Sequence, residues 1–204
     1  LVMITKNGKI KKTSLEEFAN VRKSGIIAIK LDKGDSLEKV VTTSGKDDII
    51  LTTKHGIAIR FKEEDARPMG RTTSGVRGIR LKNGDEVIGM NVIMANDKPA
   101  KQYLLVVMEN GYGKRTEISQ YKIQGRGGSG IKTANITAKT GKIVLSSILE
   151  DSAKDEDLIV ISQKGQVIRT TTKSISVLSR ATQGVRIMKL DAGDKIASGT
   201  CLEE

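Results

Sequence analysis

The sequence predicts an all-β protein in which about four strands form each of four blades of a propeller-like array. Three observations predict this fold: an internal repeat of roughly 50 residues, short runs rich in Val, Ile and Thr that end at glycine turns, and a near absence of helical patterns. A sheet that recurs at this period buries its faces against its neighbours, so the array forms a core without helices.

Each repeat begins with an apolar run that ends at a glycine turn, and a second strand follows the turn. The first runs, including their turns, occupy residues 1–8, 49–56, 104–111 and 158–165. Their turn glycines are Gly8, Gly56, Gly111 and Gly165, spaced by 48, 55 and 54 residues. We therefore expect repeats at about residues 1–48, 49–103, 104–157 and 158–204, which together form a single partial domain.

A second glycine precedes another strand-like run in every repeat. It follows the turn glycine by 17 residues in the first repeat and by 19 in the others, at Gly25, Gly75, Gly130 and Gly184. The runs after it cover residues 26–31, 76–81, 131–136 and 185–190. A third turn with the sequence Gly-Asp closes three of these runs, whereas the third repeat has only Thr140-Gly141 at a looser offset. Such turns are typical of β-hairpins.

Helix and linkers are confined to short segments. Ser14 as an N-cap, with Glu17 three residues later, predicts one helical turn within residues 14–21. Charged residues replace the apolar pattern at residues 96–101 and 151–157, which we expect to link neighbouring blades.

The composition favours a polyanion as partner. The 35 Lys and Arg residues exceed the 24 Asp and Glu residues, which gives a formal net charge of +11 at pH 7. No apolar run approaches the roughly 20 residues that a membrane helix requires, so we expect no membrane association. A single cysteine and a single histidine exclude an intrachain disulfide and a Cys/His zinc cluster, and the cysteine count is consistent with a reducing compartment. No secretory signal is visible, and the missing initiator Met suggests a fragment.

Cations recur at fixed offsets from the glycines. Four follow the turn glycine by four residues: Lys12, Arg60, Arg115 and Arg169. Three precede the second glycine by four residues, namely Arg71, Arg126 and Arg180, and three follow it by two residues, namely Arg77, Lys132 and Arg186. Lys30, Arg80 and Lys189 follow it by five. Equivalent offsets place side chains at equivalent points of a ring, so we predict a belt that contacts the phosphates of DNA or RNA without reading bases and binds in a salt-dependent way.

Two considerations limit this prediction. Positions two and five after a glycine point to opposite faces of a regular strand, so both reach one surface only if a bulge intervenes. Charges on exposed strands also prevent edge-to-edge aggregation, and some of these cations are then merely solvated.

One glycine-rich loop is a second candidate for phosphate binding. It consists of Gln124, Gly125, Arg126, Gly127, Gly128, Ser129 and Gly130. Its glycines permit positive φ and bring backbone amides close to a phosphate, while Arg126 supplies a charge-assisted hydrogen bond. The alternative is a loop between blades that needs glycine for its geometry alone. It is not a Walker loop, because no Gly-Lys-Ser/Thr sequence or helix follows.

Residues 60–81, 110–116 and 180–186 resemble the C-terminal domains of bacterial DNA gyrase A subunits, which belong to the type IIA topoisomerases. The resemblance covers essentially all 204 residues, and the corresponding domain of topoisomerase IV is a weaker match. It implies a β-pinwheel whose outer edge bends and wraps duplex DNA, and thereby biases strand passage toward negative supercoiling in the intact bacterial enzyme. It implies no cofactor in this chain, since ATP and Mg²⁺ are used elsewhere in the enzyme. The implied partners are double-stranded DNA, the rest of the gyrase A subunit, and the gyrase B subunit, at the nucleoid in the cytoplasm.

The resemblance also identifies the glycine-rich loop as a degenerate copy of the family's box, usually Gln-Arg-Arg-Gly-Gly-Lys-Gly. Gly125 and Ser129 stand where the box has basic residues, and the loop lies in the third repeat present. We therefore expect the true box before Leu1. The family's usual six blades imply that about two are missing from these four repeats.

No catalytic or metal site is expected from the residues. His55 lies in a turn without a Ser or Cys partner, and Cys201 is expected to be a small, partly buried hydrophobe. The run Glu63, Glu64 and Asp65 is expected to be a solvated surface. The resembled enzyme cleaves DNA with a tyrosine of another domain, so Tyr103, Tyr112 and Tyr121 are expected to serve packing or the rim. The alternative to a DNA-wrapping domain is a propeller-type scaffold that binds acidic proteins.

Overall fold

Fifteen strands and four single-turn 3₁₀ helices make up the described part of the chain. The computed structural model describes residues 1–21, 23–95, 101–151 and 156–203. Its strands are β1 (Val2–Thr5), β2 (Lys9–Lys12), β3 (Leu37–Val41), β4 (Asp48–Thr53), β5 (Ile57–Lys62), β6 (Val76–Arg77), β7 (Val87–Ile93), β8 (Gln102–Met108), β9 (Tyr112–Glu117), β10 (Ile131–Lys132), β11 (Ile143–Glu150), β12 (Glu156–Ser162), β13 (Val167–Thr171), β14 (Val185–Arg186) and β15 (Ile196–Glu203). The helices are η1 (Leu15–Phe18), η2 (Glu63–Asp65), η3 (Ile118–Gln120) and η4 (Thr172–Ser174).

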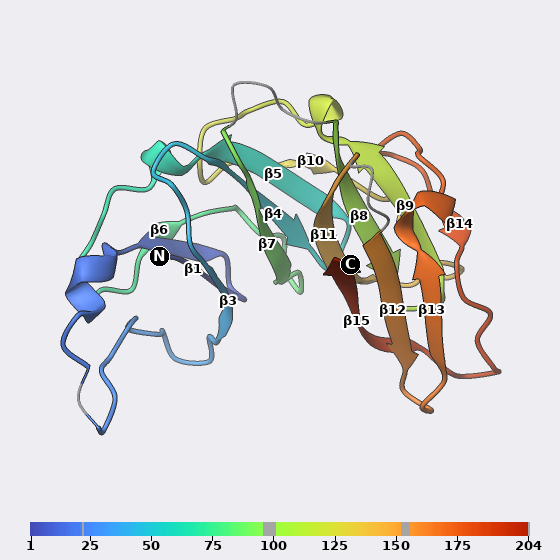
Figure 1. The fold of residues 1–204 in the computed structure, drawn as a ribbon, viewed down its shortest axis with the longest axis horizontal. Helices are drawn as coiled ribbons and strands as arrows, with labels where there is room; N and C mark the ends of the chain where they lie inside the picture. Colours follow the sequence, from blue (N-terminus) through green and yellow to red (C-terminus); the bar gives the residue numbers. More distant parts are fainter. Residues whose placement is uncertain (22, 96–100, 152–155, 204) are drawn as a thin grey trace.

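The strands form four antiparallel sheets, which we number 1 to 4 along the chain. Sheet 1 has the order β3-β1-β2-β6, sheet 2 the order β7-β4-β5-β10, sheet 3 the order β11-β8-β9-β14 and sheet 4 the order β15-β12-β13. The sheets stand side by side in an arc, with β3, β7, β11 and β15 along its inner edge and β6, β10 and β14 along its outer edge (Figure 1). The predicted all-β array of four blades is confirmed.

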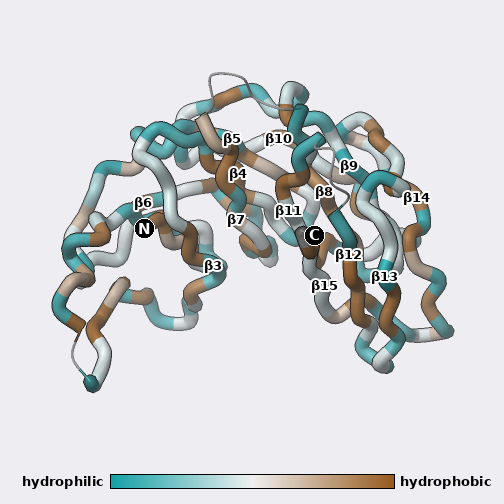
Figure 2. The backbone as a smooth tube through the Cα atoms, in the orientation of Figure 1, coloured by the Kyte–Doolittle hydropathy of each residue, from teal (hydrophilic) through white to brown (hydrophobic). Residues whose placement is uncertain are grey.

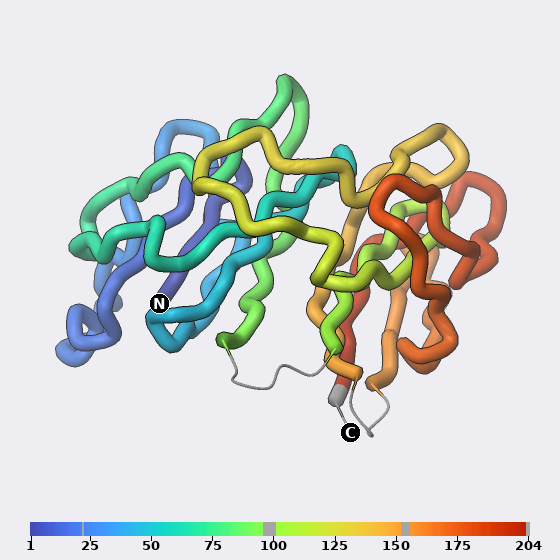
Figure 3. Tube along the Cα trace, turned by 90° about the horizontal axis from the view of Figure 1, so that it is seen from above, coloured from blue at the N-terminus to red at the C-terminus, as the bar shows by residue number. Residues whose placement is uncertain are grey.

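Each outer strand comes from the repeat that follows. β6 of the second repeat pairs with β2 of the first, where Lys9 faces Arg77, and β10 and β14 pair in the same way with β5 and β9. The segment that carries β10 crosses from sheet 3 back to sheet 2, as the yellow trace in Figure 3 shows. The repeats are therefore joined by strand exchange, which a local reading of each repeat does not reveal.

The expected strand at residues 26–31 does not form, and this prediction was wrong. The equivalent strands β6, β10 and β14 each pair with the second strand of the preceding repeat, whereas no described strand pairs with residues 26–31. In the other repeats the strand is only two residues long. Sheet 4 has three strands in the described residues, without a counterpart of β6, β10 or β14.

Three hydrophobic clusters lie between successive sheets, and they explain the unbroken apolar runs. Ile49 and Leu51 of β4 pack in the cluster shared with sheet 1, whereas Ile50 packs in the cluster shared with sheet 3. In β8, Leu104 and Leu105 divide in the same way between the second and third clusters. Successive side chains of a strand point to opposite faces, and both faces are buried here. Figure 2 shows these hydrophobic stretches in the strands of the arc.

Two other local predictions have different outcomes. The expected helical turn near Ser14 is η1, where the Ser14 hydroxyl accepts a hydrogen bond from the Glu16 amide at 3.4 Å. Most of the predicted linkers at residues 96–101 and 151–157 lies outside the described residues. None of the helices in the described part of the chain has the length and apolar character that a membrane crossing requires.

Candidate nucleic-acid interface

A β-bulge at the outer edge of each complete sheet decides which cations face outward. The carbonyl of the turn glycine accepts hydrogen bonds from two successive amides of the following repeat, such as Gly78 at 2.7 Å and Ile79 at 3.4 Å onto Gly8. The same pattern recurs at Gly56 and Gly111. Gly78 and Ile79 are buried while Arg77 and Arg80 are both exposed. The bulge therefore brings positions two and five after the second glycine to one surface.

Six of the predicted cations form an exposed row along this edge, which we call the outer row. Lys30, Arg77, Arg80, Lys132, Arg186 and Lys189 are all exposed, and they lie on β6, β10, β14 or the segments at equivalent offsets. Within the described residues, none of the six forms an ion pair with a carboxylate, and Lys132 Nζ contacts only the Asn135 side-chain oxygen, at 3.5 Å. Their positive charge is therefore available to an external anion.

Arginines fasten the loops behind the outer row to one another. Arg71 donates to the Ile27 carbonyl at 3.0 Å, and Arg180 donates to the Lys132 carbonyl at 3.0 Å. Arg126 makes the equivalent bond to the Arg77 carbonyl and a second to the Asp65 carbonyl at 3.0 Å. All three side chains are half-buried. These arginines set the position of one rim loop against the preceding one, and their contact with DNA stays a prediction.

Three of the four cations after the turn glycines join neighbouring sheets. Lys12 donates to the Glu63 carbonyl at 3.1 Å, and Arg115 donates to the Ile175 carbonyl at 2.8 Å. Arg60 pairs with Asp48, with 2.6 Å between Nη2 and Oδ2, and also reaches the Ile118 carbonyl at 3.4 Å. Each of these three therefore contacts η2, η3 or the segment after η4 of the following repeat.

Arg169, in sheet 4, is exposed and pairs with Asp157. The belt predicted from sequence thus divides into outward and joining cations, and DNA contact by Lys12, Arg60, Arg115 and Arg169 stays a prediction.

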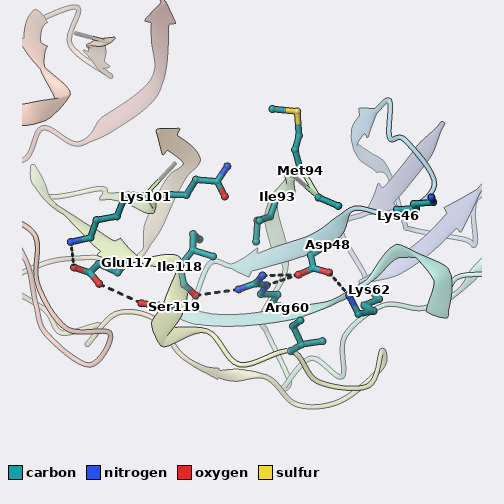
Figure 4. Close-up of a pocket in the computed structure, with 13 residues that line it drawn as sticks. Lys46, Asp48, Arg60, Lys62, Ile93, Met94, Lys101, Glu117, Ile118 and Ser119 are labelled. Carbon is teal, nitrogen blue, oxygen red and sulfur yellow. Dashed lines mark hydrogen bonds and ion pairs between the residues drawn. The ribbon is translucent and has the colours of Figure 1, made fainter. Parts of the chain in front are cut away.

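A pocket of about 480 Å³ lies between sheets 2 and 3 (Figure 4). Three of its four cations have carboxylate partners: Arg60 and Lys62 flank Asp48, and Lys101 lies 2.7 Å from Glu117. The lining keeps a net positive charge, but most of its cations, unlike those of the outer row, are paired with an acid.

The glycine-rich loop, residues 124–130, packs closely on sheet 2. Gly127 (φ +81°) donates its amide to the Gly78 carbonyl at 2.8 Å, and the Gly128 carbonyl accepts from the Arg80 amide at 2.8 Å. A Cβ at Gly130 (φ +67°) would lie 2.6 Å from the Ala58 carbonyl oxygen. Glycine is therefore required at position 130 because the loop backbone lies too close to neighbouring backbone for a side chain to fit, and the positive φ favours glycine at position 127 as well. Gly125 and Ser129 are exposed, and phosphate binding by the loop's amides stays a prediction.

Two buried lysines support the rim from inside and were not singled out in the sequence. Lys114 Nζ donates to the carbonyls of Ser179 and Arg180, both at 2.6 Å, and contacts the Thr182 hydroxyl at 3.2 Å. Lys11 makes the equivalent bond to the Arg71 carbonyl and another to the Ala28 carbonyl of its own repeat. Burial, followed by the nearby Arg180 charge, lowers the pKa of Lys114 to about 8. The sequence does contain a signal for their burial: both lysines stand three residues after the turn glycine, where the other two repeats have isoleucine.

Several side chains set aside during the sequence analysis also have defined places. Glu63 is buried and accepts the amides of Gly45 and Asp47 at 2.7 and 2.8 Å, so the expectation of a solvated residue was wrong. Cys201 is half-buried, and burial raises the pKa of its thiol to about 11. Across the described residues, no three His, Cys, Asp or Glu side chains come together as a metal site would require.

Comparison with known proteins gives a consistent family assignment. Residues 1–44, 47–94, 102–145 and 156–202 match the family model described as DNA gyrase C-terminal domain, beta-propeller. The chain is 44% identical over 198 residues, 97% of its length, to the DNA gyrase A subunit of Staphylococcus epidermidis, and 44% identical over 190 residues to that of Staphylococcus aureus. It spans only 22% and 21% of the length of these two relatives.

Two solved structures share the fold. The chain superposes on a DNA gyrase A C-terminal domain with a TM-score of 0.80 at 29% identity, covering 98% of this chain and 64% of the other. It superposes on the C-terminal domain of a DNA topoisomerase IV with a TM-score of 0.89 at 22% identity, covering 99% of this chain and 61% of the other. The topoisomerase IV likeness shows the fold alone, because the identity is low.

Proposed function

Because this chain belongs to the family of DNA gyrase C-terminal domains, we propose that it binds double-stranded DNA along its outer edge and bends the duplex around the arc. The observation that carries the proposal is the outer row: six exposed cations without carboxylate partners in the described residues, three of them on the outer strands β6, β10 and β14 and three at equivalent offsets in neighbouring segments. Phosphates of a bent duplex meet such a row at intervals, and the resulting affinity is insensitive to base sequence.

The shape of the arc supports bending. Successive outer strands follow a convex curve (Figure 1), and hydrogen bonds from Arg71, Arg126 and Arg180 hold the intervening rim loops in place. A rigid curved row of charge favours the bent form of DNA because the contacts offset the cost of bending, on the order of 1–6 kcal/mol for a site of 20–30 base pairs.

Within a complete gyrase, this bending would wrap a DNA segment beside the cleavage site and bias strand passage toward negative supercoiling. The remainder of the gyrase A subunit, the gyrase B subunit, ATP and Mg²⁺ would supply the cleavage and the energy in the bacterial cytoplasm, at the nucleoid. The cofactor-free and noncatalytic role of this chain is part of the same proposal. The sequence relatives favour gyrase over topoisomerase IV as the parent enzyme.

A salt titration of duplex binding tests the proposal. Fluorescence anisotropy of a duplex of about 40 base pairs should show log K falling linearly with log salt, with a slope near −5 if all six cations of the outer row meet phosphates, at about 0.9 for each contact. Replacing Arg77 and Arg80 with Gln should reduce the slope by about 2, equally for unrelated DNA sequences. The matched control replaces Lys46 and Lys101 with Gln. These lysines precede β4 and β8, so they lie at the ends of these strands that are far from the glycine turns and the outer row.

Other results would contradict the proposal. Duplex affinity that is independent of salt, or lost equally in the control, would exclude phosphate contacts by the outer row. Tight, salt-insensitive binding to an acidic protein would instead support a scaffold. Wrapping is tested separately by ligating a nicked circle with the chain bound, where an unchanged linking number would refute it.

A further inference from the structure

The third repeat departs from the other three at its third turn. In repeats 1, 2 and 4 an Asp of the Gly-Asp turn accepts a backbone amide of the glycine turn at about 3 Å: Asp35 from Asn7, Asp85 from His55, and Asp194 from Lys164. The third repeat has no such Asp. Glu109, in the glycine turn itself, accepts the Lys142 amide at 2.8 Å instead. The looser offset of Thr140-Gly141 therefore corresponds to a loop of different construction.

This loop, residues 137–142, is fixed to the glycine turn of its own repeat. The Asn110 amide donates to the Thr140 carbonyl at 3.1 Å, and the Asn110 side chain donates to the carbonyls of Ala138 and Lys139 at 3.0 and 3.2 Å. Thr140 is fully buried and bonds Thr137 within the loop. The backbone at Lys139 is thus held against Asn110, which lies two residues before Tyr112 in the chain.

As a result, two cations converge on one tyrosine at the outer edge of sheet 3. Lys139 Nζ lies 5.4 Å and Arg186 Cζ lies 5.7 Å from the centre of the Tyr112 ring. Arg186 faces Tyr112 across β9 and β14, and its Nη2 donates to the Tyr112 hydroxyl oxygen at 3.3 Å. Among the described residues neither cation has a carboxylate partner, so their two charges are not neutralised.

The equivalent places on the other sheets differ. On sheet 1, Lys9 faces Arg77 and is paired with Asp32. On sheet 2, Lys132 faces Ile57, which brings no charge or hydroxyl group. Sheet 3 alone among these three combines two unmatched cations with a hydroxyl group in the described structure.

We propose that Arg186, Lys139 and the Tyr112 hydroxyl form a phosphate site on the outer edge of sheet 3, occupied by a backbone phosphate of bound DNA. The identity of the occupant rests on the proposed function. A guanidinium and an ammonium group supply charge-assisted donors to phosphate oxygens. The hydroxyl accepts from Arg186 and therefore keeps its own hydrogen for an anion. The ring attracts both cations without neutralising them, so they are held in place before the ligand arrives.

The same contacts lower the pKa of the Tyr112 hydroxyl, first through the hydrogen bond from Arg186 and further through the charges of Arg186 and Lys139. This direction agrees with an electropositive site and follows from the same geometry.

Titration with inorganic phosphate tests the site itself. We expect saturable shifts of the backbone amide signals of Tyr112, Lys139 and Arg186 in NMR spectra of the 204-residue chain, against chloride at equal ionic strength. The Lys139→Gln variant should lose them, whereas Lys46→Gln should keep them. Absence of saturable shifts at these amides would overturn the site.

Duplex binding tests the occupant. One phosphate contact contributes about 0.9 to the salt slope, which corresponds to about eightfold in affinity at 0.1 M salt, so we expect a loss of this size for Lys139→Gln or Arg186→Gln. Two cations that contact one phosphate should be coupled. The double variant Lys139→Gln/Arg186→Gln should therefore lose less affinity than the product of the two single losses. In the control pair Arg80→Gln/Arg186→Gln, the loss of affinity should equal the product of the single losses.

The failures are distinguishable. If the Lys139 and Arg186 losses are multiplicative, or no larger than that of Lys46→Gln, while phosphate still saturates the site, a DNA phosphate is not its occupant. If the wild-type chain binds no duplex, the proposed function fails, and the phosphate titration alone decides whether the site exists.

Discussion

Replacing Lys114 with Met should change how the stability of the domain depends on pH. Lys114 is fully buried, and its ammonium group is held by the Ser179 and Arg180 carbonyls and the Thr182 hydroxyl, without an ion pair in the described structure. Burial lowers its pKa from 10.5 to about 8 in the folded chain. The folded state therefore releases this proton at a lower pH than the unfolded state does.

The sign and size follow from proton linkage. Below about pH 8 both states carry the proton, and the folded state bears the full cost of a buried charge, about 3 kcal/mol at 1.36 kcal/mol for each pKa unit. Between pH 8 and pH 10.5 only the unfolded state remains largely protonated, so this cost disappears as the pH rises. Integrating the linkage relation from about pH 7 to about pH 9.5 gives a gain of about 2 kcal/mol.

Urea unfolding followed by circular dichroism measures this gain. The free energy of unfolding of the wild type minus that of Lys114→Met should rise by about 2 kcal/mol over that range, since the subtraction removes the other titrating groups. Ile168→Met, at the equivalent position of sheet 4, is the control, and its difference should not depend on pH. A wild-type minus Lys114→Met difference that stays flat or falls with pH would refute the assignment of a buried, unpaired ammonium group.

Two further predictions concern local geometry. Gly130→Ala should lower the free energy of unfolding by about 1–3 kcal/mol, because φ is +67° and the new Cβ would lie 2.6 Å from the Ala58 carbonyl oxygen; Gly125→Ala in the same loop, with no atom within 4 Å of its Cβ, should have little effect. Equal effects in thermal or urea unfolding would contradict the close approach. Glu63→Ala should destabilise the chain by about 1–3 kcal/mol, because the amides of Gly45 and Asp47 lose their buried acceptor, whereas the exposed Glu64→Ala should be nearly neutral in the same assay. A neutral Glu63→Ala would show that these bonds contribute nothing to stability.

Local sequence was sufficient for the blades and their turns. The turn glycines Gly8, Gly56 and Gly111 were identified from spacing alone, and each has a positive φ of about 80° in the structure. A positive φ favours glycine at that one position, so such a turn can be predicted from the sequence without knowing the rest of the fold. The all-β class and the family membership were predictable for the same reason, since they rest on repeated short motifs.

Whether an individual cation is exposed, paired or buried was decided only by the tertiary structure. Arg60 and Arg80 both stand at repeated offsets, yet Arg60 joins sheet 2 to η3 through Asp48 and the Ile118 carbonyl, whereas Arg80 faces solvent. Lys114 was not singled out in the sequence and is buried. Spacing fixes where a side chain falls within its repeat, but its partners come from the following repeat through strand exchange, some 50 or more residues away in the chain. Burial and charge pairing depend on those distant atoms, and for that reason the sequence determined the repeats while the assembled sheets determined which cations have no carboxylate partner among the described residues.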